Sequence, residues 1–170
     1  MNYANITFGQ GMNATMVQAA SAFCSVVNGG QYFRPTVVAG TVDVNGGLRP
    51  STASLLRRTI SEQSSATMRG MLSTARAVLN QRMPDKDKPG YDVGGKTGTS
   101  ETLINGSYTM DETVATYIGY GGANRPEYVI IVRVAAPGKR KNLQGNIHAA
   151  PIFTDISNWM IDYMKLVPKG

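Results

Sequence analysis

Three stretches of the chain decide its fold: DVGGKTGTS at residues 92–100, TVATYIGY at 113–120 and YVIIVRV at 128–134. The last two are rich in β-branched and aromatic residues, which favour strands. The turn at Asn124-Arg125-Pro126 is short enough to join them as an antiparallel hairpin. With the first stretch as a further strand, the sequence predicts an antiparallel sheet of at least three strands. The nearly continuous apolar run at 128–134 predicts a central strand that is buried on both faces.

Apolar residues at helical spacing predict three helices around this sheet. The first is capped by Asn13 and stops at Asn28-Gly29-Gly30. The second follows Ser61 and has one apolar stripe, composed of Met68, Met71, Leu72, Ala75, Val78 and Leu79. The third is opened by Pro151 and should turn one face to the sheet, composed of Ile152, Phe153, Ile156, Trp159, Met160, Tyr163 and Met164. The fold class is therefore α/β, with a packed C-terminal helix and further helices on the opposite side or end of the sheet.

Less regular segments connect these elements. Residues 36–44 predict short extended segments joined by a glycine turn at 45–47, and the polar residues 80–90, with two prolines, predict an exposed loop. Tyr117, Tyr120 and Tyr128 alternate with apolar residues and need only half-buried surfaces.

Length and composition narrow the classes of function. A chain of 170 residues that is 42% hydrophobic forms a single domain with a real core. Its net charge of +6 suits an anionic ligand, a cell-wall polymer or a phospholipid surface. The charges are scattered apart from Lys139-Arg140-Lys141, so an ordinary basic surface is the simpler interpretation, and nucleic acid is not an expected partner. Only 16% of the residues are charged, which indicates that a partner covers part of the surface.

Cysteine and histidine usage excludes further classes. Cys24 and His148 are the single cysteine and the single histidine, so neither a disulfide framework nor a Cys/His metal cluster can form within the chain. We expect no metal and no cofactor. His148 with Asp155 suggests a catalytic triad only weakly, because nothing in the sequence places a serine beside them. The acidic pairs Asp85/Asp87 and Asp111/Glu112 fall in turn-rich segments and are expected to be solvated.

Lys96 is part of two overlapping sequence motifs that predict different functions. Residues Gly90 to Thr97 match G-x-x-x-x-G-K-[ST], the phosphate-binding P-loop of nucleotide hydrolases. That loop must leave a buried strand and open a helix, whereas here Gly98 follows within two residues of Lys96 and breaks any helix. The alternative motif is Lys96-Thr97-Gly98, the K-T-G box of serine acyl-transferases that recognise penicillin. A cation and hydroxyls on a strand edge can hold a substrate carboxylate, and Gly98 lets a ligand lie along the backbone.

The motifs that accompany this box resemble one family. The chain is similar to the C-terminal part of the transpeptidase domain of class B penicillin-binding proteins, particularly the FtsI-like peptidoglycan synthases. The matching pieces, in the family's order and spacing, are Phe8-Gly9-Gln10-Gly11, Asn28-Gly29-Gly30, Ile60-Ser61-Glu62, residues 93–101, Tyr117-Ile118-Gly119-Tyr120, residues 128–134 and Ala149-Ala150-Pro151-Ile152-Phe153.

The resemblance implies roles for the residues of the box. Lys96 supplies positive charge at the catalytic centre, and Thr97 and Thr99 offer hydroxyls to the carboxylate of the acyl donor or of a β-lactam. The backbone N–H of Thr99 is one of two donors of the oxyanion hole, so Lys96 and Thr99 are the catalytic candidates. Gly98 completes the substrate-binding wall.

The sequence departs from the family in two motifs. No serine has lysine three residues later, as in the nucleophile box S-x-x-K, and none has asparagine two residues later, as in S-x-N. The nearest approaches, Ser54 with Arg57 and Ser73 with Arg76, place arginine where a proton acceptor is needed, and arginine stays charged. In the family both boxes precede the Phe8-Gly9-Gln10-Gly11 segment. We therefore expect residues 1–170 to be the C-terminal portion of one transpeptidase domain, without its nucleophile.

That interpretation predicts a function, partners and a location. The parent protein is expected to be a D,D-transpeptidase that cross-links peptidoglycan stem peptides ending in D-Ala-D-Ala. It is also expected to bind β-lactams. It is expected outside the cytoplasmic membrane, anchored by an N-terminal segment. The chain alone is expected to be inactive, to require the upstream half of the domain and to self-associate. A P-loop hydrolase, or a non-catalytic interaction domain of the same fold, remains an alternative.

Overall fold

The computed structural model describes residues 13–104, 107–135 and 142–169. Two features of the sequence argument lie outside these residues: the Phe8-Gly9-Gln10-Gly11 segment and the basic cluster Lys139-Arg140-Lys141. The helices are α2 (Met16–Val27), α3 (Glu62–Gln81) and α4 (Ala150–Tyr163), the last preceded by a π-helical turn η1 (Gly145–Ala149). The strands are β1 (Gln31–Phe33), β2 (Gly40–Val42), β3 (Leu48–Pro50), β4 (Leu55–Arg58), β5 (Asp92–Ile104), β6 (Ser107–Gly122) and β7 (Tyr128–Val134). The α/β fold class is confirmed.

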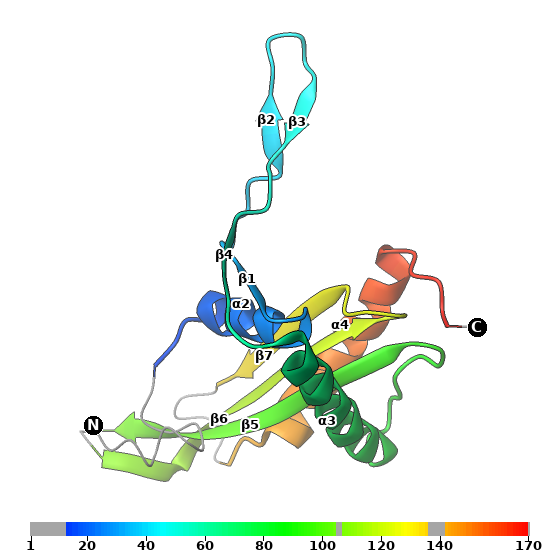
Figure 1. Ribbon diagram of the computed structural model, residues 1–170. Helices are drawn as coiled ribbons and strands as arrows, with labels where there is room; N and C mark the ends of the chain where they lie inside the picture. Colours follow the sequence, from blue (N-terminus) through cyan, green and yellow to red (C-terminus); the bar gives the residue numbers. More distant parts are fainter. Residues whose placement is uncertain (1–12, 105–106, 136–141, 170) are drawn as a thin grey trace.

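The main sheet has the order β5-β6-β7 and is antiparallel throughout. The side chains of β6 alternate between its faces, so Tyr117 joins the core under α4 while Tyr120 joins the core under α2 and α3. Figure 1 shows α3 and α4 on opposite sides of the sheet. The bounds predicted for β7 are confirmed, but β7 is an edge strand of this sheet and β6 is the central one. The prediction of a central strand was wrong because an apolar run indicates that a strand is buried, but not which strands pair with it in the sheet.

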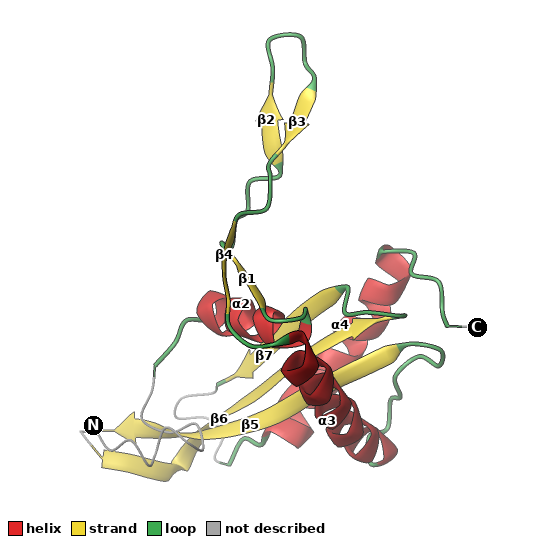
Figure 2. Cartoon of the chain, viewed as in Figure 1, coloured by secondary structure: helices red, strands yellow, loops and turns green. Residues whose placement is uncertain are grey.

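The remaining strands form an arm that projects from the body of the molecule. β1 pairs with β4 at its base and β2 pairs with β3 nearer its tip, and Figure 2 shows this ribbon standing clear of the sheet and helices. Asp43 closes the tip, because its carboxylate accepts hydrogen bonds from the N–H groups of Asn45 and Gly47. The predicted extended segments around a glycine turn are present in this arm, although they are shorter than residues 36–44.

Helix caps agree closely with the sequence argument. Ser61 caps α3, with its hydroxyl accepting from the Ser64 N–H, and Asn28 with Gly29 ends α2. The cap of α2 is Thr15 rather than Asn13, and it forms a capping box with Gln18.

The faces that the helices bury differ from the predicted ones. On α4 the buried residues are Ala150, Phe153, Thr154, Ser157 and Ile161, while the larger apolar residues Ile152, Ile156, Trp159 and Tyr163 are exposed. On α3 the buried residues are Ser65, Leu72 and Arg76, while Met68, Met71 and Val78 are exposed. Small and hydrogen-bonding residues are buried beside Phe153 and Ile161 because the sheet approaches α4 closely: a Cβ on Gly119 would lie 2.7 Å from the Phe153 ring, and the Tyr128 hydroxyl bonds to Ser157 at 2.8 Å.

Two further predictions about burial were wrong. Tyr117 and Tyr120 are fully buried rather than half-buried. The loop between α3 and β5 is not simply exposed, because Met83 is only 5% exposed and the Asp87 carboxylate pairs with the buried Arg76. None of the described helices is long and apolar enough to cross a membrane.

The exposed face of α4 leads to a prediction about association. Ile152, Ile156, Trp159 and Tyr163 recur at helical spacing, and the last two rings stack with centroids 4.8 Å apart. We expect the isolated chain to self-associate and to bind an apolar dye, and Trp159→Glu to shift the population toward monomer in sedimentation. Asp155→Asn, on an exposed position of the same helix, is the control. A monodisperse monomer at high protein concentration would contradict this prediction.

Candidate active site

The K-T-G residues lie in the middle of β5, at an edge of the main sheet. Lys96, Thr97 and Gly98 pair with Ile118, Tyr117 and Thr116 of β6. No other strand in the described part of the chain pairs with the outer edge of β5. An extended ligand could therefore align along that edge as an added strand.

Lys96 is exposed, and its ammonium group lies against the next residue of its own strand, Thr97. Nζ lies 3.0 Å from the carbonyl oxygen of Thr97 and 3.3 Å from its hydroxyl. Among the salt bridges of the described residues, none involves Lys96. Its charge is not neutralised by a neighbouring carboxylate, so it can attract an anionic ligand.

The backbone around Gly98 is tightly covered on one side. A Cβ at Gly98 would clash with the Thr116 hydroxyl, and a Cβ at Gly145 would lie 2.7 Å from the carbonyl oxygen of Gly98. The Gly145 N–H donates to Oγ1 of Thr99 at 3.3 Å. A side chain at position 98 would force the Thr116 hydroxyl to move, and a side chain at position 145 would clash with the backbone of Gly98, so both glycines allow close packing here. Nothing in the sequence signalled that Gly145, in η1, would lie against the box.

A cavity of about 600 Å³ adjoins the box. Its lining combines backbone and side chains of β5, the C-terminal half of α3, the following loop and η1, namely Ala75, Val78, Leu79, Arg82, Met83, Pro84, Gly95, Lys96, Thr97, Tyr117, Asn146, Ile147 and Pro151. Among the described residues, the lining contains two cations, Arg82 and Lys96, and no carboxylate. Such a cavity suits a ligand that carries both a negative charge and apolar groups.

The structure does not provide the geometry of a P-loop. Residues Asp92–Ile104 form one continuous strand, so Lys96 lies within a strand rather than at a junction between strand and helix. No helix N-terminus follows the lysine to face a phosphate group.

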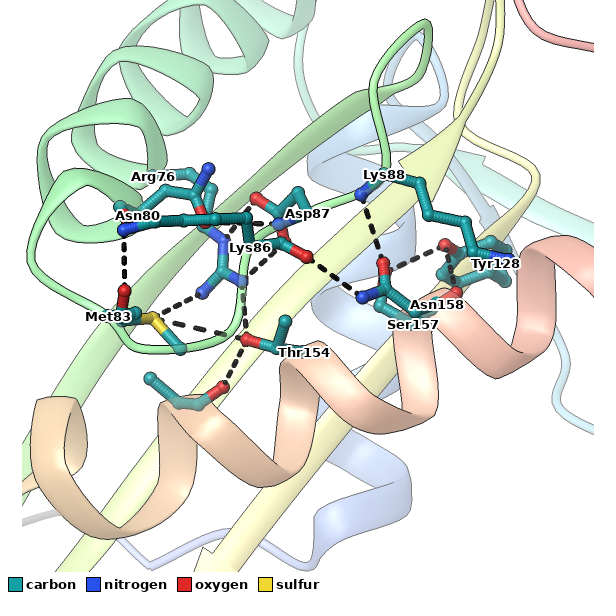
Figure 3. Close-up of polar contacts among 11 residues, drawn as sticks. Arg76, Asn80, Met83, Lys86, Asp87, Lys88, Tyr128, Thr154, Ser157 and Asn158 are labelled. Atoms are coloured by element: carbon teal, nitrogen blue, oxygen red, sulfur yellow. Dashed lines mark hydrogen bonds and ion pairs between the residues drawn. The ribbon is translucent and has the colours of Figure 1, made fainter.

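A buried polar cluster joins α3, the loop that follows it and α4, next to the cavity (Figure 3). Arg76 is 1% exposed and binds the Asp87 carboxylate with two hydrogen bonds, of 2.8 Å through Nε and 2.6 Å through Nη2. Nη2 also donates to the Thr154 hydroxyl of α4 at 2.8 Å. The prediction that Asp87 is solvated was wrong, because its partner is eleven residues away in sequence, too far for a helical spacing rule to pair them.

Asp111 and Glu112 lie within β6, so the prediction of a turn-rich segment at these residues was wrong. His148 and Ser73 are held by hydrogen bonds to other residues of the protein. In η1, Nδ1 of His148 accepts from the Gln144 N–H at 3.0 Å. Ser73 bonds to Asp92 at 2.7 Å and to the Tyr120 hydroxyl at 3.0 Å. These contacts give Ser73 a structural role under β5.

Burial also changes the acidity of three core tyrosines. Desolvation raises the pKa of Tyr117, Tyr120 and Tyr128 above the ordinary value. The hydroxyl of Tyr117 has no hydrogen-bond partner among the described residues. Each of the three phenols therefore remains neutral in the folded protein at a pH where it ionises in the unfolded chain.

These raised pKa values predict a loss of stability in alkali. Stability is fully present below the unfolded tyrosine pKa of about 10 and falls as pH rises toward the folded values, by about 1.4 kcal/mol per pH unit for each phenol. Tyr117→Phe should flatten this decline in melting temperature between pH 9 and 11, while Tyr163→Phe, on an exposed position, should not. Equal slopes for the two variants would count against the prediction.

Fold and site define a class of protein. An antiparallel sheet flanked by helices, with K-T-G on an edge strand beside a cationic and apolar cavity, is the arrangement of serine acyl-transferase domains that recognise penicillin. Residues 2–158 match the model of the penicillin binding protein transpeptidase domain, so the chain belongs to that family. The resemblance predicted from the sequence is confirmed.

Similar proteins agree with this assignment. Penicillin-binding protein PbpB of Mycolicibacterium smegmatis is 28% identical over 167 residues, covering 94% of this chain and 26% of that protein. Stage V sporulation protein D of Bacillus subtilis is 29% identical over 168 residues, covering 98% of this chain and 26% of that protein. Among solved structures, penicillin binding protein 3 from Mycobacterium tuberculosis, complexed with aztreonam, has a TM-score of 0.79 and 30% identity over 99% of this chain and 39% of that one. The chain thus spans about a quarter of the length of these curated relatives.

Proposed function

We propose that this chain is the C-terminal portion of a peptidoglycan D,D-transpeptidase domain, and that it supplies one wall of the active site. The observation that carries the proposal is Lys96-Thr97-Gly98-Thr99 on an edge of β5 that no described strand covers, with a cation that forms no ion pair with any described carboxylate. Family membership supports it, as do relatives named peptidoglycan D,D-transpeptidase, such as PenA of Neisseria gonorrhoeae.

The reaction is acyl transfer through a serine outside this sequence. The serine oxygen attacks the carbonyl between the two D-alanines of a stem peptide, an ester forms, and the terminal D-alanine leaves with a proton. The amine of a neighbouring peptide then attacks the ester, which forms the cross-link and returns the proton to the serine. A β-lactam acylates the same serine, but its ring-opened product keeps the leaving group attached.

The residues of this chain bind and orient the acyl donor. Lys96 contributes positive charge, and the hydroxyls of Thr97 and Thr99 donate to the substrate carboxylate. The Thr99 hydroxyl accepts a hydrogen bond from the Gly145 N–H, so the hydroxyl proton of Thr99 is free to donate to the substrate. The N–H of Thr99 acts as an oxyanion-hole donor, an interaction whose loss costs about 3 to 4 kcal/mol in comparable sites.

Three further features belong to the same proposal. The nucleophile and its base reside in upstream residues of the domain, which pack against this chain. The complete protein acts on the outer side of the cytoplasmic membrane, where peptidoglycan is assembled, and an N-terminal segment anchors it there. The P-loop alternative has no support in the geometry of β5.

The proposal is tested on the longer protein that contains this segment. Fluorescent penicillin should label it stoichiometrically at a serine, and a stem-peptide substrate should release D-alanine. A protein that binds neither penicillin nor stem peptide, although correctly folded, would instead be a non-catalytic interaction domain of this fold.

A further inference from the structure

Arg76 is the largest of the fully buried residues in the described part of the chain. It projects from α3 into the space between the sheet and α4, where its donors reach three residues on two elements: Asp87 and the Met83 sulfur, at 3.6 Å, in the loop after α3, and Thr154 on α4. Figure 3 shows these contacts converging on one guanidinium group. The cluster ties α3, α4 and the loop that leads into β5 at a single point.

Backbone contacts extend the cluster on both sides. Lys86 Nζ caps the end of α3 through the carbonyl oxygens of Asn80, at 2.6 Å, and Gln81, at 3.1 Å. The side chain of Asn158 on α4 bonds to the carbonyl of Lys86 and accepts from the N–H of Lys88. The loop is thereby held in one conformation as it enters β5.

The guanidinium group also lies over two aromatic rings. Its Cζ atom is 5.3 Å from the centroid of Tyr117 and 5.1 Å from that of Phe153. The two rings contact each other, with centroids 4.6 Å apart. An arginine so placed attracts both rings electrostatically and fixes their positions.

Tyr117 is the link between this cluster and the K-T-G box. It pairs with Thr97 across the sheet, and a Cβ at Gly95 would lie 2.6 Å from its hydroxyl oxygen. Because Gly95 has no side chain, the tyrosine ring packs directly against the backbone of β5, one residue before Lys96. A displacement of the ring therefore displaces the strand that carries Lys96 and Thr97.

We infer that Arg76 is a positioning residue for acyl transfer: held by Asp87 and Thr154, it fixes the Tyr117 ring and thereby the backbone of residues 95–97. The inference rests on the proposed function. It also explains why a buried ion pair is used where apolar residues would pack as stably. Arginine provides N–H donors in a rigid planar fork, which make four hydrogen bonds here, and a flat face for the rings; an aliphatic side chain has neither.

The test separates positioning from stability in the longer protein. Asp87→Asn leaves a buried charge without its partner and should lower both the melting temperature and the rate of acylation by penicillin. The double variant Arg76→Met/Asp87→Leu should recover most of the melting temperature, because both buried charges are removed. Its first-order acylation rate at saturating penicillin should nevertheless stay about ten- to a hundredfold low, with little change in the dissociation constant of the non-covalent complex.

Two variants complete the design. Thr154→Val removes one hydrogen bond to Arg76 while the ion pair remains, so it should lower the acylation rate severalfold even if the double variant does not fold. Arg125→Met breaks an exposed ion pair with Glu127 and serves as the control for loss of an arginine. Acylation at the unchanged rate by the folded double variant, or by Thr154→Val, would overturn the inference. Failure of the unchanged protein to be acylated at all would overturn the proposed function instead.

Discussion

Acylation by penicillin should slow by about a hundred- to a thousandfold when Lys96 is replaced by alanine in the longer protein. The lysine carries the only cation among residues 92–100, and its ammonium group lacks a carboxylate partner in the described structure. In the proposed active site, its removal takes positive charge from the place where the substrate carboxylate would bind and negative charge would develop. The measurement is stopped-flow acylation across a range of penicillin concentrations, which separates binding from the rate of the covalent step.

The fold should tolerate this substitution. The Lys96 side chain is exposed, and among the described residues its hydrogen bonds go to Thr97 of its own strand, so the melting temperature should change little. Lys169→Ala, near the C-terminus, removes an equal charge away from the box and should leave acylation unchanged. Unaltered kinetics for Lys96→Ala, with the fold intact, would remove Lys96 from the active site.

The chain of residues 1–170 alone should form no covalent adduct with penicillin. Acylation requires an oxygen nucleophile beside a base that can take its proton, and no serine of this sequence lies in S-x-x-K. Ser73, one of the two serines nearest to that pattern, bonds to Asp92 and Tyr120, while Arg76 binds Asp87 instead of that serine. Loss of the nucleophile from such a site costs about six powers of ten in rate.

Intact-mass spectrometry tests this expectation. The chain is incubated for many hours with excess penicillin, and the longer protein is treated in parallel as the positive control. Weak reversible binding at Lys96 is compatible with the prediction, because it leaves the mass unchanged after denaturation. A stoichiometric mass increase that maps to a serine of residues 1–170 would show that the chain contains its own nucleophile.

Several elements follow from local sequence alone. The caps at Ser61 and Asn28, the bounds of β7 and the placement of K-T-G on a strand rather than in a phosphate-binding loop were all predicted and confirmed. Each depends on residues within about ten positions of one another, through capping hydrogen bonds, β-branched side chains or the exclusion of glycine from helices. Family membership likewise follows from the order and spacing of short motifs.

Tertiary structure decided which faces of the helices are buried and which residues pack against the K-T-G box. Periodicity located an apolar stripe on α4, yet Thr154 and Ser157 are buried while Trp159 is 57% exposed, because Thr154 bonds to Arg76 and Ser157 bonds to Tyr128 of the sheet. The pairing of Arg76 with Asp87 and the position of Gly145 over Gly98 join residues far apart in the chain. Sequence by itself determined the elements and the chemical groups of the box; only folding brought together the long-range contacts that fix where β5 holds them.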